Sequence, residues 1–161
     1  MTDTGDLAAR VGRRLVERRE TLVVAESSAG GLVTASLLAL PGASRFFLGG
    51  AVVYTATARE VLLGITPAQM DGFRSASEPY ATLLARTARD RFGAIWALSE
   101  TGATGPSGNR YGDAPGHACL AVSGPVDRSR VVATGSDDRA GNMTSFTLAA
   151  LSLLDEAIAA A

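Results

Sequence analysis

Short runs of branched apolar residues alternate with helical segments, and this alternation constrains the fold more than any other feature. Apolar runs typical of buried strands lie at residues 21–25, 51–54 and 94–99. A turn signal at 124–127 predicts a closing hairpin of two further strands, 117–123 and 130–134. Helical patterns or helix boundary signals mark five other segments, 7–15, 32–40, 56–63, 77–92 and 139–158. This order predicts an α/β protein with a three-layer α/β/α sandwich and a mixed, partly parallel sheet.

The composition excludes several classes of protein. A chain of 161 residues with 47% hydrophobic and 19% charged residues suits one globular domain, which we expect to span residues 1–161. A net charge of −1 argues against binding to nucleic acid or to an anionic membrane. Apolar runs are too short to span a bilayer, and residues 1–6 do not resemble a signal peptide. We therefore expect a cytoplasmic protein, with a homo-oligomer as the default assembly.

The chain contains no lysine, because all 15 of its basic residues are arginine. This absence removes mechanisms that need lysine as a base, a Schiff-base former or a phosphate clamp. His117 and Cys119 are the single residues of their kinds, so no cluster has the spacing of metal ligands. We expect neither a metal nor another cofactor.

A sharp turn after the first predicted strand is the first candidate site, with the sequence Glu26-Ser27-Ser28-Ala29-Gly30-Gly31. The N-terminus of the following helix offers backbone N–H groups and a positive dipole end, which suit a phosphate, carboxylate or oxyanion. Ligand contacts are expected from Glu26, Ser28, Gly30 and Gly31, with Ser27 a possible nucleophile. The alternative is structural: Ser27 or Ser28 caps the helix and the glycines allow close packing.

A Gly/Thr-rich loop at 101–108 follows the strand at 94–99, and parallel strands would place it beside the first turn. Gly102, Thr104 and Gly105 are the expected ligand contacts. The loop lacks the Gly-Lys-Ser/Thr of a P-loop.

Two further places could contact the same ligand. Tyr54 ends a strand and Arg59 lies one turn into the next helix, so they could face a ligand together. Arg139, at the start of the last helix, could reach a phosphate. The structural alternative is an edge position for Tyr54 and a solvated helix face for Arg59. For Arg139 the alternative is a surface ion pair.

In this order and spacing, the segments resemble the C-terminal domain of the CinA competence/damage-inducible family. The family's Glu-Ser-Cys-Thr-Gly-Gly turn corresponds to residues 26–31, and its Gly-Ile-Ala-Gly-Pro loop corresponds to residues 102–106. Its Thr-Tyr-Ser-Asn-Glu-Ala-Lys stretch and its Gly-Asp-Arg correspond to residues 53–59 and 137–139. The resemblance covers nearly the whole chain. It implies a nicotinamide-nucleotide amidohydrolase, which converts nicotinamide mononucleotide to nicotinic acid mononucleotide and ammonia.

The resemblance implies Ser27 as the nucleophile and Tyr54 as a catalytic tyrosine, whereas the family's lysine is replaced by Arg59. A guanidinium stays protonated and cannot accept the serine proton. Tyr54 activated by Arg59, or Glu26 close to Ser27, remains as a base.

Three functions stay open. The first is the amidohydrolase, and the second is a catalytically silent protein that binds a pyridine nucleotide. A nucleic-acid-associated module has only the arginine-rich first helix and the family's name in its favour, and the net charge opposes it.

Overall fold

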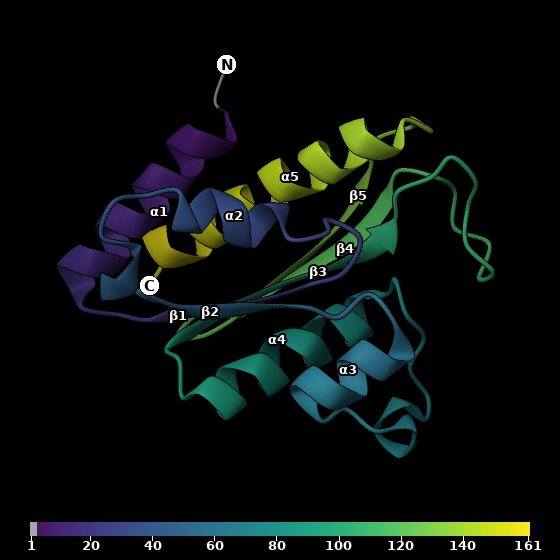
Figure 1. Ribbon diagram of the computed structural model, residues 1–161, viewed down its shortest axis with the longest axis horizontal. Helices are drawn as coiled ribbons and strands as arrows, with labels where there is room; N and C mark the ends of the chain where they lie inside the picture. Colours follow the sequence, from purple (N-terminus) through teal and green to yellow (C-terminus); the bar gives the residue numbers. More distant parts are fainter. Residues whose placement is uncertain (1–2) are drawn as a thin grey trace.

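A five-stranded sheet in the order β2-β1-β3-β4-β5 forms the centre of the computed structural model, which describes residues 3–161 (Figure 1). β1 pairs in parallel with β2 and β3, whereas β4 is antiparallel to both β3 and β5. The predicted α/β sandwich with a mixed, partly parallel sheet is therefore confirmed. The strands are β1 (Leu22–Glu26), β2 (Phe47–Val52), β3 (Trp96–Ala103), β4 (His117–Ser123) and β5 (Arg128–Ala133).

Helices cover both faces of the sheet, with α1, α2 and α5 on one face and α3 and α4 on the other (Figure 1). Two short 3-10 helices, η1 and η2, were not predicted. None of the helices within residues 3–161 is both long and apolar enough to cross a membrane. The bounds are α1 (Thr4–Arg18), α2 (Leu32–Leu38), η1 (Ala43–Arg45), α3 (Ala56–Leu63), η2 (Pro67–Met70), α4 (Glu78–Phe92) and α5 (Arg139–Ala159).

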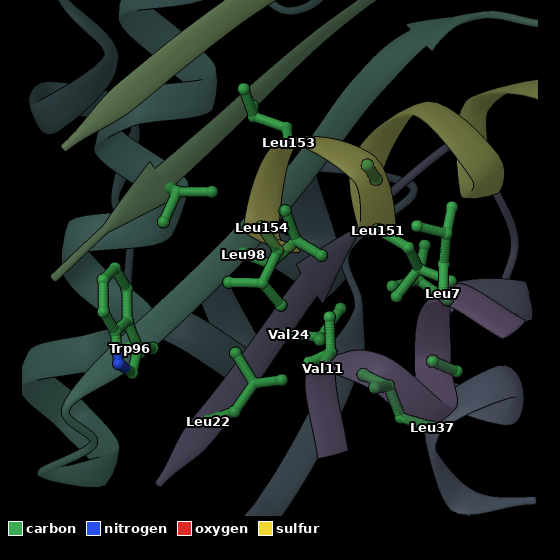
Figure 2. Packing of buried hydrophobic residues seen from close by; sticks show 14 of the residues in the cluster. Leu7, Val11, Leu22, Val24, Leu37, Trp96, Leu98, Leu151, Leu153 and Leu154 are labelled. Carbon is green, nitrogen blue, oxygen red and sulfur yellow. The ribbon is translucent and has the colours of Figure 1, made fainter. Parts of the chain in front are cut away.

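The sheet divides the core into two clusters because successive side chains of a strand point to opposite faces. On β1, Leu22 and Val24 join the cluster beneath α1, α2 and α5, part of which Figure 2 shows. Val23 and Ala25 join the cluster beneath α4. All five residues of β1 are buried, which explains why its sequence is a continuous apolar run before Glu26.

Local signals fix most helix ends. Ser77 caps α4 by accepting a hydrogen bond from the N–H of Tyr80 at 3.3 Å, and Thr55 caps α3 in the same way. α5 has no side-chain cap, because Asp138 occupies the N-cap position without a capping hydrogen bond. Ser136 Oγ instead accepts a hydrogen bond from the N–H of Asp138.

The third strand extends further than predicted. β3 continues to Ala103, so residues 101–103, predicted as part of a loop, belong to the sheet. Antiparallel pairing with β4 extends the strand, with Gly102 opposite Ala118. A Cβ at Gly102 would lie 2.4 Å from the carbonyl oxygen of His117, so this position requires glycine. β2 also begins earlier than predicted, because Phe47 already pairs with Leu22.

Candidate functional site

The candidate site lies at the edge of the sheet where β1, β2 and β3 end. These strands run in the same direction, and the carboxyl ends of such strands are where α/β sheets bind ligands. A cavity of about 320 Å³ opens there, which we call the Ser27 cavity. Its lining includes Ser27 after β1, Tyr54 and Arg59 after β2, and Gly102 on β3. The fold thus brings the three predicted segments together.

A second cavity of about 230 Å³, which we call the Arg139 cavity, adjoins the first. Both cavities are lined by Tyr54, Gly102 and Asn109. The Arg139 cavity adds four residues that the sequence predicted as ligand contacts, namely Ser28, Thr104, Gly105 and Arg139. Together the two cavities form one site with two chambers.

The side chain of Glu26, the last residue of β1, lies at the N-terminus of α2. Its buried carboxylate accepts hydrogen bonds from the N–H groups of Val33 at 3.1 Å and Thr34 at 2.9 Å. The helix is therefore capped from the preceding strand by a charged side chain, which the positive end of the helix dipole favours. This carboxylate occupies two of the helix N–H donors expected to bind a ligand. Glu26 itself lines neither cavity, so its expected ligand contact has no support in the geometry.

The glycines of the turn are structural in this geometry. Gly31, not Ser27 or Ser28, stands at the N-cap of α2, with φ of 100°. The N–H of Gly30 donates to the carbonyl of Ser27 at 3.1 Å, so it is not free to bind an oxyanion. Neither glycine lines a cavity, and the expected ligand contacts of Gly30 and Gly31 have no support in the geometry.

Glu100 was not predicted as a site residue, yet its carboxylate lies directly under the serine turn. It accepts hydrogen bonds from the N–H groups of Ser27 at 3.0 Å and Ala29 at 2.8 Å, and from the hydroxyl of Ser28. Burial raises the pKa of Glu100 to about 7, and the nearby charge of Glu26 acts in the same direction. The sequence signal that could have identified it is an acidic residue directly after the apolar run at 94–99.

Tyr54 and Arg59 both line the Ser27 cavity, as a shared ligand would require, but no hydrogen bond joins them among residues 3–161. Tyr54 is 60% exposed, and its hydroxyl accepts a hydrogen bond from Nη2 of Arg139 at 3.3 Å. Arg59 instead contacts Tyr80, with its guanidinium 5.5 Å from the ring centre and Nη1 3.5 Å from the hydroxyl oxygen. Burial raises the pKa of Tyr80 and outweighs the opposite effect of Arg59, so this tyrosine is a poor base.

A loop at residues 104–116 forms the other wall of the site. Arg139 Nη1 donates to the carbonyl of Gly105 at 2.7 Å, which fixes one end of the loop to α5. Near its other end, Asp113 forms a two-point ion pair with Arg74, with N–O distances of 2.7 and 3.2 Å. This partner lowers the pKa of Asp113.

Two arginines give the site its capacity for anions. Arg59 lines the first cavity and Arg139 the second, and guanidinium groups bind phosphate and carboxylate through paired N–H donors. Nε of Arg59 is buried and has no hydrogen-bond partner among residues 3–161. In the same part of the chain, no group of three or more His, Cys, Asp or Glu residues could hold a metal ion.

Curated relatives share this sequence over most of its length. A CinA-like protein of Chlorobium limicola is 40% identical over 156 residues, covering 92% of this chain and 36% of that protein. A CinA-like protein of Prochlorococcus marinus is 40% identical over 124 residues, covering 77% of this chain and 29% of that protein. The chain spans about a third of the length of the curated relatives it matches.

Solved structures share the fold. A competence or damage-inducible protein from Enterobacter asburiae superposes with a TM-score of 0.90 at 26% identity, covering 98% of this chain and 99% of that one. The competence/damage inducible protein CihA from Agrobacterium tumefaciens gives 0.87 at 26% identity, covering 96% and 94%. The family described as the CinA C-terminal domain matches residues 4–158. The chain therefore belongs to the CinA C-terminal domain family.

Proposed function

We propose that this chain hydrolyses the carboxamide of nicotinamide mononucleotide to give nicotinic acid mononucleotide and ammonia. The observation that carries the proposal is that Ser27 shares one cavity with Tyr54 and Arg59. A nucleophilic hydroxyl and an anion-binding guanidinium in one pocket suit a substrate that carries both an amide and a phosphate.

In this reaction the Oγ of Ser27 forms a bond to the carboxamide carbon. Tyr54 takes the serine proton while donating its own to the departing nitrogen, which leaves as ammonia. Water then hydrolyses the resulting ester and restores the serine. The hydrogen bond from Arg139 to the hydroxyl oxygen of Tyr54 orients this tyrosine between the two cavities.

The phosphate of the substrate fits Arg59, whose buried Nε lacks a partner among residues 3–161. An anion at this position would satisfy the free donor and remove the cost of burying it unpaired. Arg59 in this role binds the substrate and takes no part in proton transfer.

A second function, binding of a pyridine nucleotide without hydrolysis, is favoured by one feature. The family's lysine is replaced by Arg59, which cannot accept the proton of Ser27. Such a protein would keep affinity for nicotinamide mononucleotide and release no ammonia.

Ammonia release from nicotinamide mononucleotide by the purified protein separates these functions. We expect turnover in the wild type and its loss in Ser27→Ala. Ser36→Ala is the matched control, because Ser36 is a partly exposed helical serine that lines neither chamber of the site and whose hydroxyl bonds only to the carbonyl of Leu32 in the described structure.

If the wild type releases no ammonia, calorimetry with the same nucleotide shows whether the protein still binds it. Retained binding without ammonia, together with activity in Arg59→Lys, would assign the chain to the binding function. Neither binding nor turnover in the wild type would remove nicotinamide mononucleotide as the ligand.

A further inference from the structure

One of the two fully buried carboxylates near the site, Glu100, has no part in the proposed reaction. It lies on β3, the central strand of the sheet. A carboxylate in such a place needs several hydrogen bonds to offset its lost hydration.

Those hydrogen bonds all come from one short segment. One carboxylate oxygen, Oε2, accepts the N–H groups of Ser27 and Ala29, at 3.0 and 2.8 Å. The other oxygen accepts the hydroxyl of Ser28. The N–H of Ser27 is shared with the backbone carbonyl of Glu100, at 3.1 Å, so residue Glu100 of strand β3 holds the turn through three donors.

We propose that Glu100 is a positioning residue for Ser27: its ionised carboxylate fixes the turn that presents the serine to the cavity, and protonation of the carboxyl weakens and rearranges the hydrogen bonds that hold the serine there. An ionised carboxylate only accepts hydrogen bonds, which matches the three donors that face it. A protonated carboxyl carries its own O–H, so the hydrogen bond with the Ser28 hydroxyl must reverse and the bonds from the two N–H groups lose the strength that an ionised acceptor gives.

Charges around Glu100 do not compensate its own. Glu26 on β1 is the in-register neighbour of Glu100, and its charge raises the pKa of Glu100 further. The charge of Glu100 in turn contributes to raising the pKa of the Cys119 thiol on β4. α2 contains no ionisable residue, and the guanidinium of Arg139 on α5 is bonded to Gly105 and Tyr54. With a pKa of about 7, Glu100 changes its charge near neutral pH.

Amide signals of the wild-type protein test the ionisation directly. The ¹⁵N–¹H resonances of Ser27 and Ala29 should move together between about pH 5.5 and about pH 8.5, with a midpoint near 7, because both amides bond to the titrating carboxylate. The amides of Val33 and Thr34, bonded to Glu26, are the internal comparison. Static Ser27 and Ala29 signals across this range would overturn the proposal, whether or not the protein hydrolyses anything.

Kinetic measurements test the effect of Glu100 on Ser27, and this test rests on the proposed function. The wild-type kcat should fall below about pH 7, with KM much less affected, because the phosphate site does not include Glu100. Glu100→Gln should lower kcat by about 100-fold and remove this fall in acid, since its side chain cannot ionise. Glu156→Gln, an exposed carboxylate paired with Arg130, should keep the wild-type profile.

The outcomes separate the two proposals. No ammonia from the wild type at any pH contradicts the hydrolysis, while the amide titration still decides the role of Glu100. Ammonia release with an unchanged acid limb in Glu100→Gln contradicts the role of Glu100 and leaves the hydrolysis intact. Glu100→Asp keeps the charge but shortens its reach, so we expect it to retain an acid limb with a reduced kcat.

Discussion

The two walls of the site are held in place by different physical means. The serine turn at residues 26–31 is fixed by the buried carboxylates of Glu26 and Glu100, which bond to backbone N–H groups. The loop wall at residues 104–116 is fixed largely by polar groups nearer the surface, including the exposed ion pair of Arg74 with Asp113.

This difference predicts different responses to solution conditions. Salt screens exposed charges strongly and buried ones weakly, so the loop wall should respond to ionic strength. The serine turn should respond to pH instead, because it contains a buried carboxyl with a pKa of about 7. The wall that carries the proposed nucleophile is therefore the one insulated from salt.

Removing the cap of α2 should have the largest effect. Glu26→Ala leaves the N–H groups of Val33 and Thr34 buried without their acceptor, and we expect the free energy of unfolding to fall by about 4 kcal/mol. Urea denaturation measures this value. Glu60→Ala on the exposed surface of α3 is the control. An equal loss of stability in both variants would show that the Glu26 carboxylate does not hold the serine turn in place.

The pH dependence of stability should be nearly as large. The pKa of Glu100 rises from 4.5 to about 7 on folding, so between these values the folded protein holds a proton that the unfolded chain releases. The free energy of unfolding should therefore fall as pH rises through this window, by about 3 kcal/mol from this group.

Urea denaturation at several pH values, compared between the wild type and Glu100→Gln, isolates that contribution. The wild type should lose stability relative to the variant from about pH 4.5 to about pH 7, and the difference should be constant above it. Parallel curves would show that the buried carboxyl does not distinguish the two walls.

An intermediate effect is expected where the loop wall meets α5. Asn142 is buried, and its Nδ2 donates to the carbonyls of Thr104 and Ser136, both at 2.8 Å. Asn142→Ala should lower the free energy of unfolding by about 2 kcal/mol, because the buried carbonyl of Thr104 and the partly buried carbonyl of Ser136 lose their donor. Thermal denaturation checks this, with the exposed Thr144→Ala on the same helix as control. A loss no larger than that of the control would mean that the loop is anchored elsewhere.

The smallest effect is expected at the surface ion pair. Arg74→Ala should lower stability by at most about 1 kcal/mol, because the arginine side chain is 42% exposed and solvent screens the charge. Denaturation of the wild type and the variant at low and high salt measures the difference, which should shrink as salt rises. A loss that is large and independent of salt would contradict the contrast between the walls.

Much of the fold could be predicted because its signals are local. Ser77 followed by Pro79, and the glycines after α3 and α4, mark helix ends through effects that reach only a few residues along the chain. Strand β3 was predicted too short because its last residues are held by pairing with β4, which no local pattern encodes.

The candidate site was predicted in its location and only partly in its contacts. The sequence placed Ser27, Tyr54 and Arg139 in segments that the fold brings together. It placed Tyr54 and Arg59 at one ligand, and both line the Ser27 cavity. It did not predict that Arg59 contacts Tyr80, because packing of α3 on α4 decides which side chains can reach each other.

By itself, the sequence determined the layer order, the strand-end location of the site, the absence of lysine and the family. Only the tertiary structure decided that Glu26 caps a helix and that Glu100 holds the serine turn. Ser27 and Glu100 are separated by more than 70 residues in the chain, and their contact exists because β1 and β3 pair in parallel with Glu26 opposite Glu100. Hydrogen bonds over such distances depend on strand register, and register follows from the packing of the whole sheet.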